Sequence, residues 1–253
     1  MLLTIDIGNT SVKLSLFDGD KELDFAVVDS PVENCRSMLL QFIYKANLRE
    51  DVIDRAILSC VVPSAYEKMY DALESVVGEG NIIDIVPEMD YGLTLDIPEA
   101  ESLGDDLLVM CSYAYSLYHR EMIVISMGTC TVLNHVTEDG KYQHCIIAPG
   151  FTKISETLWK NAALLPTFDT KKSDSFLPNN TVDAMNTGIY NGYIGMLRYL
   201  INGMKKQIGK DVYIIGCGGL GKMVVNDIPE INEYEPDLVT KGLQYIYKRY
   251  FND

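Results

Sequence analysis

The feature that most constrains this chain is an order of predicted elements that occurs twice. Each copy opens with three short segments, either continuous apolar runs or alternations of apolar and polar residues, and both patterns predict β-strands. Asp18-Gly19-Asp20 in the first copy and Glu138-Asp139-Gly140 in the second predict hairpin turns. The six predicted strands are residues 2–8, 11–17, 23–28, 122–126, 131–136 and 142–148.

Helices and further strands follow each set of three strands. Ser30-Pro31-Val32-Glu33 predicts the cap and first turn of a helix that runs to about Asn47. The order strand-strand-strand-helix-strand-helix then holds in both copies, which predicts two similar α/β lobes, residues 1–118 and 119–253. The other predicted elements are strands at 55–62, 81–86 and 212–215, a helix from Pro63, helices at 107–118, 152–164, 181–207 and 237–250, and a loop at 167–180.

The charge of the chain excludes some classes of partner. Its 36 acidic and 21 basic residues give a net charge of −15. Such a surface repels phosphate backbones and anionic lipids, so we expect neither general nucleic-acid binding nor membrane binding. An anionic substrate must then be met by local dipoles, a metal ion or a few chosen cations.

The cysteines and the N-terminus predict a cytoplasmic protein. The six cysteines show no CxxC spacing and sit mostly in apolar segments, which predicts reduced thiols in the core and no zinc site. The first ten residues carry neither the basic region nor the cleavage site of a signal peptide, and no apolar stretch is long enough for a membrane span.

Two turns, one in each predicted lobe, are candidates for phosphate binding. Asp6-Ile7-Gly8-Asn9-Thr10 places a carboxylate beside free backbone N–H groups and a hydroxyl, a set that suits a phosphate chain with magnesium. The alternative is a plain hairpin turn in which Gly8 and Asn9 supply positive φ. Met127-Gly128-Thr129 stands at the equivalent place in the second copy, which favours the phosphate interpretation.

The third glycine-rich loop fits two well-known patterns only in part. Gly216-Cys217-Gly218-Gly219-Leu220-Gly221-Lys222 matches GxGxxG and nearly matches a P-loop, but Met223 stands where a P-loop has Ser or Thr. Both folds also need more α/β units than the rest of the chain provides. We expect a strand-to-helix turn whose bare backbone accommodates the sugar or base of a nucleotide.

Two acidic residues open the predicted helix at 107–118. Asp105 and Asp106 follow Gly104, and carboxylates at a helix N-terminus commonly act as caps. The alternative is that one of them is a general base, which accepts the proton of a substrate hydroxyl during phosphoryl transfer.

In this order, these motifs resemble those of the type III pantothenate kinases, a family that includes proteins named Bvg accessory factors. The resemblance covers nearly the whole chain, and it implies the actin-like/sugar-kinase fold, an α/β class with two duplicated ribonuclease H-like lobes. The segments that carry it are Asp6–Thr10 with Lys13, Ser59–Pro63, Gly104-x-Asp106, Gly128-Thr129-x-Thr131, Ala148-Pro149-Gly150, Leu164-Leu165-Pro166, Thr181-Val182-x-Ala184-Met185, Gly188, Tyr193, Gly195, Gly218-Gly219-Leu220 and Leu238–Tyr247.

The resemblance implies an ATP-dependent kinase that phosphorylates the hydroxyl of pantothenate, the first step of coenzyme A biosynthesis. It implies magnesium, a monovalent cation (K⁺ or NH₄⁺), and a homodimer with the substrate pocket at the interface. Asp106 would be the base, Asp6 would hold magnesium directly or through water, and Gly104, Asp105, Leu107 and the partner's Thr181 would line the pantothenate pocket. The residues implied to hold ATP and its phosphates are Asp6, Ile7, Gly8, Asn9, Thr10, Ser11, Val12, Lys13, Gly128, Thr129, Gly218 and Gly219.

Four positions depart from the family pattern. Leu107 stands where the family has an Arg that meets the pantothenate carboxylate, and Ile97 stands where it has a substrate-binding Tyr. Ser126 and Asn134 replace acidic residues, and Ser126 is the position that serves the monovalent cation. Three alternatives follow: a pantothenate kinase whose pocket uses other groups, a kinase for another small hydroxyl compound, or a pseudokinase or regulatory binding protein of the same fold.

Aromatic residues on the predicted long helix are a second indication of a dimer. Tyr190, Tyr193 and Tyr199 are more than the core of one lobe needs, although packing inside the molecule is the alternative.

Overall fold

The computed structural model describes residues 1–30, 32–86, 88–98, 103–161 and 165–251, and these form two compact units. Unit 1 comprises Met1–Tyr118 and Asp237–Asp253, and unit 2 comprises His119–Pro236. The sequence analysis assigned the last helix to the second lobe. This is wrong, because α7 (Leu238–Phe251) packs on α3 (Asp105–Tyr118) and on β1 (Leu2–Ile7) of unit 1.

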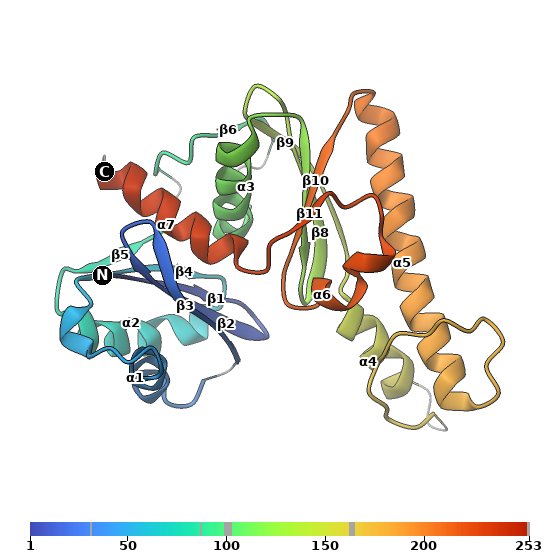
Figure 1. Ribbon diagram of the computed structural model, residues 1–253, viewed down its shortest axis with the longest axis horizontal. Coiled ribbons are helices and arrows are strands. Elements are labelled where there is room, and N and C mark those ends of the chain that lie inside the picture. Colours follow the sequence, from blue (N-terminus) through green and yellow to red (C-terminus); the bar gives the residue numbers. More distant parts are fainter. Residues whose placement is uncertain (31, 87, 99–102, 162–164, 252–253) are drawn as a thin grey trace. The chain divides into compact units, whose positions relative to one another are not determined.

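The sheet of unit 1 has the strand order β3-β2-β1-β4-β5 (Figure 1). β1, β2 (Ser11–Asp18) and β3 (Lys21–Asp29) form an antiparallel meander, and β4 (Arg55–Cys60) and β5 (Ile82–Asp84) run parallel to β1. Each parallel strand is reached through a helical connection, as parallel pairing requires.

Alternation along β1 separates the two faces of this sheet. Leu3, Ile5 and Ile7 pack with α1 (Cys35–Lys45) and α2 (Pro63–Val77). Leu2 belongs to the opposite face, where α3 and α7 pack. Because side chains alternate along a strand, Asp6 lies on the same face as Leu2, which is the face that α3 covers.

Specific contacts explain why α1 and α7 lie where they do. α1 starts at Cys35 with Asn34 as its cap, because the Asn34 side chain accepts from the Ser37 N–H; the cap predicted at Ser30 is wrong, and Pro31 lies outside the described residues. On α7, a Cβ atom at Gly242 would lie 2.7 Å from the carbonyl oxygen of Val109, so glycine allows α3 and α7 to approach closely.

The sheet of unit 2 repeats this topology. Its strands β9 (Lys141–Pro149), β8 (Cys130–Val136), β7 (Met122–Met127), β10 (Tyr213–Cys217) and β11 (Glu233–Tyr234) are neighbours in that order. The first three again form an antiparallel meander, and β10 and β11 are parallel to β7. The predicted duplication of the lobes is therefore confirmed.

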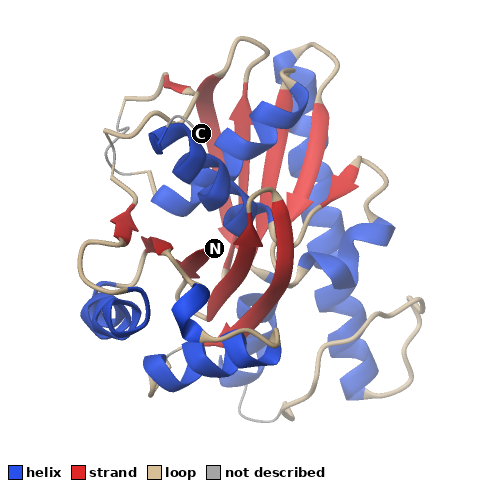
Figure 2. Ribbon diagram, turned by 60° about the vertical axis from the view of Figure 1, so that its left-hand side comes forward, coloured by secondary structure: helices blue, strands red, loops and turns tan. Residues whose placement is uncertain are grey.

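Helices α4 (Phe151–Asn161) and α5 (Thr181–Ile208) pack on one face of the unit 2 sheet, and the short α6 (Gly221–Val224) follows β10 (Figures 1 and 2). Tyr190 and Tyr193 are buried there, so these two tyrosines belong to the core of unit 2; Tyr199 is 81% exposed. Their use as an indication of a dimer is wrong, because both pack edge-on against Phe151.

Two smaller differences from the sequence analysis remain. Cys130 and Cys145 are exposed rather than in the core, and the six cysteines are free thiols. The short β6 (Thr94–Leu95) and β11, and the 3₁₀ turns at Glu50–Val52 and Val225–Asp227, were not predicted, because two or three residues carry no periodic pattern. Within the described ranges, no helix has the length and apolar character needed to cross a membrane.

Candidate active site

The β1–β2 turn places a carboxylate and a lysine side by side. Asp6 and Lys13 are cross-strand partners, and Lys13 Nζ donates to Asp6 Oδ2 at 2.7 Å. The Gly8 N–H donates to the Ser11 carbonyl at 2.9 Å and closes the turn, and a Cβ atom at Gly8 would lie 3.2 Å from the same oxygen. Asn9 and Thr10 are exposed at its tip.

The other oxygen of Asp6 is left without a partner. Asp6 is 2% exposed, and its Oδ1 is buried with no hydrogen bond. An ionised buried oxygen without a donor is costly, so the site is suited to a positive ligand at this atom. Carboxylate oxygen is the ligand type that Mg²⁺ prefers, usually with water and phosphate oxygens completing its shell. Asp6 therefore fits a bound magnesium ion.

Asp106 joins this pair on the same face of the unit 1 sheet. It lies in the first turn of α3, where the Leu107 and Leu108 N–H groups both donate to the Gly104 carbonyl. A Cβ atom at Gly104 would lie 2.7 Å from Asp106 Oδ1, so the glycine makes room for the carboxylate to fold back beside the start of the helix.

The electrostatics of Asp106 suit a general base. Burial, followed by the negative charge of Asp6, raises the pKa of Asp106 from 3.8 to about 6, although the charge of Lys13 lowers it. Burial alone raises the pKa of the neighbouring Asp105. A carboxylate with a pKa near 6 is still mostly ionised at neutral pH and accepts a proton more readily than an ordinary Asp.

Ser59 is a further polar residue here, to which the sequence analysis gave no role. It lies beside Asp6 in the parallel β1–β4 pair, is 1% exposed, and its Oγ has no hydrogen-bond partner. Its signals in the sequence were its place near the carboxyl end of an apolar strand and in the Ser59–Pro63 segment that resembles the family. Its hydroxyl adds a second unsatisfied oxygen next to the Asp6 carboxylate.

The β7–β8 turn of unit 2 has a related backbone with different side chains. Its Gly128 N–H donates to the Cys130 carbonyl at 3.0 Å, and the Gly150 N–H donates to the Thr129 carbonyl at 3.1 Å. A Cβ atom at Gly150 would collide with the carbonyl oxygens of Gly128 and Thr129. The backbone of the predicted residues Gly128 and Thr129 is therefore held against Gly150, and both residues are partly exposed.

The loop at 216–222 packs against this turn. Gly218 has a φ of +93°, and a Cβ atom there would lie 2.5 Å from the Met127 carbonyl oxygen. Gly221 lies against the ring of Tyr234. Positive φ and close packing inside unit 2 are therefore sufficient to explain these glycines. Neither a dinucleotide site nor a P-loop is needed to account for them. Gly219 is exposed, with nothing within 4 Å of its Cβ position, so its backbone is open to a ligand.

The remaining predicted positions receive local explanations. Asn134 is buried, donates to the Val124 carbonyl at 3.0 Å and accepts from the Tyr142 hydroxyl at 2.7 Å, so it is part of the core. Thr181 is exposed as the first residue of α5. Ile97, Leu107 and Ser126 are half-buried. Among the described residues, no group of three or more His, Cys, Asp or Glu side chains is arranged to hold a metal.

Comparison with known proteins agrees with this architecture. The model of the type III pantothenate kinase family matches residues 2–203. A type III pantothenate kinase of Agathobacter rectalis is 32% identical over 98% of this chain and 97% of its own length.

Two solved structures are similar in fold. A Campylobacter jejuni protein assigned to the Baf family of transcriptional activators superposes with a TM-score of 0.62 at 18% identity, over 99% of this chain and all of its own. A Sinorhizobium meliloti protein assigned as a 2-dehydro-3-deoxygalactonokinase gives a TM-score of 0.57 at 11% identity, over 98% of this chain and 96% of its own.

The duplicated sheets and these neighbours define the fold as actin-like/sugar-kinase, the class expected from the sequence. Within that class, the chain belongs to the type III pantothenate kinase family.

Proposed function

We propose that this protein is an ATP-dependent kinase that transfers the γ-phosphoryl group to the hydroxyl of pantothenate, in the first step of coenzyme A biosynthesis. Family membership over nearly the whole chain supports this proposal. The observation that carries it is the position of Asp106, with its pKa raised to about 6, beside the Asp6–Lys13 pair on one face of unit 1. The pseudokinase alternative is not favoured, because the relatives that match the chain end to end are named as kinases.

In the proposed mechanism, Asp106 accepts the proton of the attacking hydroxyl as its oxygen bonds to the γ-phosphorus, while the bond from that phosphorus to the β–γ bridging oxygen breaks and ADP leaves. The Gly8 and Gly128 N–H groups are used to close the two turns, so we assign the phosphate oxygens to the other backbone and hydroxyl groups at the turn tips, and the nucleoside to the open backbone at Gly219. Magnesium, when bound, supplies positive charge that neutralises the phosphates. Asp6 Oδ1 is the oxygen we assign to it, with Lys13 holding the other oxygen of the same carboxylate.

The pantothenate pocket is the part of the proposal that departs from the family. Leu107 supplies no charge for the substrate carboxylate, so we propose that Gly104, Asp105 and the partner's Thr181 contact the pantothenate chain and that another group meets its carboxylate. We propose a homodimer on family grounds alone. Sedimentation that shows only a monomer at micromolar concentration would contradict both the dimer and a shared pocket.

We propose that a monovalent cation has little effect on turnover. Ser126 offers a neutral hydroxyl where the family has a carboxylate, so the ion loses its main charge partner. We also propose a cytoplasmic location, which follows from the use of ATP as phosphoryl donor.

The decisive experiment measures formation of ADP from MgATP with and without pantothenate, with the product identified by mass spectrometry. We expect ADP formation that depends on pantothenate and yields phosphopantothenate, and loss of both in Asp106→Asn. ADP formation that another hydroxyl compound supports and pantothenate does not would overturn the substrate. The absence of any hydroxyl-dependent turnover would overturn the kinase.

A further inference from the structure

Two buried polar side chains lie side by side in unit 1, each with an oxygen atom that lacks a partner. Asp6 on β1 and Ser59 on β4 are cross-strand partners, and neighbouring strands are about 4.8 Å apart. Ser59 follows Ile57 by two residues, and Ile57 packs with Leu2 on the face that α3 covers, so Ser59 lies on the same face as Asp6. Asp6 Oδ1 and Ser59 Oγ are both buried, and neither has a hydrogen bond to any described residue.

The stability of the free protein does not explain the Ser59 hydroxyl. The three residues before it on β4, Ala56, Ile57 and Leu58, are buried and apolar, and an alanine at position 59 would continue the strand without a polar atom. A buried hydroxyl without a partner loses its hydrogen bonds to water on folding and gains none in return. A ligand that binds beside Asp6 and also needs a hydrogen-bond acceptor would explain the serine.

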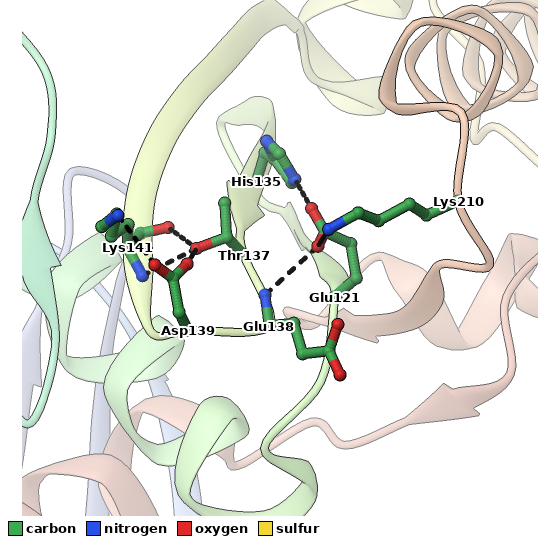
Figure 3. Close-up of polar contacts among 7 residues, drawn as sticks. All are labelled: Glu121, His135, Thr137, Glu138, Asp139, Lys141 and Lys210. Atoms are coloured by element: carbon green, nitrogen blue, oxygen red, sulfur yellow. Dashed lines mark hydrogen bonds and ion pairs between the residues drawn. The ribbon is translucent and has the colours of Figure 1, made fainter.

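A buried carboxylate in unit 2 shows how this protein satisfies such a group when no ligand is involved. Glu121 is 5% exposed, and both of its oxygens have partners (Figure 3). Its Oε1 lies 2.7 Å from His135 Nε2, and its Oε2 accepts from the Glu138 N–H at 3.2 Å and from Lys210 Nζ at 3.3 Å. Asp6 has a partner on only one oxygen, so its site is incomplete in a way that the Glu121 site is not.

The chemistry of the two oxygens in unit 1 is suited to the shell of a metal ion. Mg²⁺ binds carboxylate oxygen and usually keeps several of its waters when it binds to a protein. A water on a divalent cation is a strong hydrogen-bond donor, so its partner must be an acceptor, and the oxygen of a serine hydroxyl is one. Residues that hold the shell of a metal in this way orient it and contribute to its affinity.

We propose that the Ser59 hydroxyl oxygen accepts a hydrogen bond from a water molecule in the shell of the magnesium ion that Asp6 binds. Ser59 is a positioning residue, because it acts on the ion through water and contacts neither ATP nor the substrate. This inference rests on the proposed function, which assigns the magnesium ion to Asp6. It is tested on the protein without ATP, so its outcome does not depend on turnover.

The test measures the affinity of this site for a divalent cation directly. The probe is Mn²⁺, which prefers the same oxygen ligands as Mg²⁺ and whose electron paramagnetic resonance signal is lost on binding. We expect a bound ion that Mg²⁺ displaces and that is absent from Asp6→Asn. In Ser59→Ala, we expect the affinity for this ion to fall about tenfold, because the shell loses one of its partners. Ser59→Cys keeps a side chain of similar size, but sulfur is a weak acceptor, so its affinity should fall as well.

Ser15→Ala is the matched control. Ser15 is also a buried serine of the unit 1 sheet, but its hydroxyl donates to Thr240 Oγ1 at 2.8 Å. We expect Ser15→Ala to lower the melting temperature of the metal-free protein and to leave Mn²⁺ affinity unchanged. Ser59→Ala should show the opposite, with a melting temperature no lower than that of the wild type, because it removes a hydroxyl that has no partner in the free protein.

The failure of this inference is distinguishable from the failure of the metal site itself. Wild-type Mn²⁺ affinity in both Ser59→Ala and Ser59→Cys, with the ion lost from Asp6→Asn, would overturn the role of Ser59 alone. Wild-type affinity in Asp6→Asn would overturn the magnesium assignment and this inference with it. A melting temperature that falls as far in Ser59→Ala as in Ser15→Ala would show that the Ser59 hydroxyl stabilises the free protein, which would also refute the inference.

Discussion

The raised pKa of Asp106 leads to a specific shape for the pH dependence of the enzyme. A base must be ionised to accept a proton, and kcat/KM reports the ionisation of the free enzyme. With a pKa of about 6, roughly nine-tenths of Asp106 is ionised at pH 7 and about one-tenth at pH 5, so kcat/KM for MgATP, measured with no Mg²⁺ in excess over ATP, should fall roughly tenfold over this interval. With the ordinary pKa of 3.8, the same interval would be nearly flat.

Asp106→Asn removes the proton acceptor and keeps most of the size and capping ability of the side chain. We expect turnover to fall by roughly a hundredfold or more, with the acid limb of the pH profile removed and with ATP binding and thermal stability nearly unchanged. Asp105→Asn is the matched control in the same helical turn. Successive residues point about 100° apart, so its turnover should stay within a few-fold of wild type and its profile should keep the acid limb.

Direct titration separates the base from other causes of an acid limb. In protein labelled with ¹³C at aspartate carboxylates, the signal missing from Asp106→Asn should titrate near pH 6 in the wild type. A titration near pH 4, or a kcat/KM that is flat from pH 7 to pH 5, would refute the assignment of the base. Wild-type turnover in Asp106→Asn would do so without any titration.

Three other substitutions in unit 1 test the position of Asp106, its electrostatic environment, and the raised pKa of a second carboxyl group. Gly104→Ala places a Cβ atom 2.7 Å from Asp106 Oδ1 and should lower kcat roughly tenfold to a hundredfold by displacing the carboxylate, with little change in melting temperature. Lys13→Met removes the charge that lowers the pKa of Asp106, so the ¹³C titration should move upward, and it should cost about 3 kcal/mol or more in denaturant unfolding because Asp6 loses its partner. Burial, followed by a hydrogen bond with Asp237, raises the pKa of Glu22 from 4.5 to about 7, so folding favours the protonated form of this residue. The free energy of unfolding should therefore decrease by about 2–3 kcal/mol as pH rises from 4.5 to 7. Glu22→Gln should abolish that decrease, and an unchanged pH dependence in this variant would show that another group causes it.

Local patterns in the sequence were sufficient for most of the architecture. The apolar run at residues 2–8 and the alternation at 11–17 predicted the first two strands, because both patterns depend only on neighbouring residues. That Asp6 and Lys13 lie side by side came from the register of these strands in the structure. The repeated element order then predicted the second sheet. The electrostatic interaction between Asp6 and Asp106 could not be derived this way either, because it depends on which face of the sheet α3 covers, and that is decided by packing between distant segments.

The last helix shows the same limit. An amphipathic helix that ends the chain fits the apolar face of either sheet, so its pattern could not decide between the lobes. The contacts that decide come from three distant places: Gly242 against Val109, Thr240 bonded to Ser15 at 2.8 Å, and Gln244 bonded to the Gly19 carbonyl. The pair of Glu121 and His135 was missed for a related reason, since the residues are brought together by the register of two strands.

The two turns also show how a duplicated fold divides its chemistry. In unit 1, Ile7 pairs with Val12, so four residues form the turn; in unit 2, Met127 pairs with Thr131, so three do. The next cross-strand pair, one step further from the turn, is Asp6 with Lys13 in unit 1. The equivalent pair in unit 2 is Ser126 with Val132.

The carboxylate and its lysine are thus absent together from the second turn, as expected if each buried charge is retained only with its partner. What the turns share is the closure by a glycine N–H to a nearby carbonyl. We therefore expect the second turn to bind phosphate through backbone and hydroxyl groups, without a charged side chain of its own. In the proposed mechanism, the metal and the base chemistry would then rest on Asp6, Lys13 and Asp106 of unit 1, where the charge of Lys13 acts on both carboxylates. The remaining negative charge is what a divalent cation neutralises, so binding of Mg²⁺ alone should lower the pKa of Asp106, and a ¹³C titration that Mg²⁺ leaves unchanged would place the metal elsewhere.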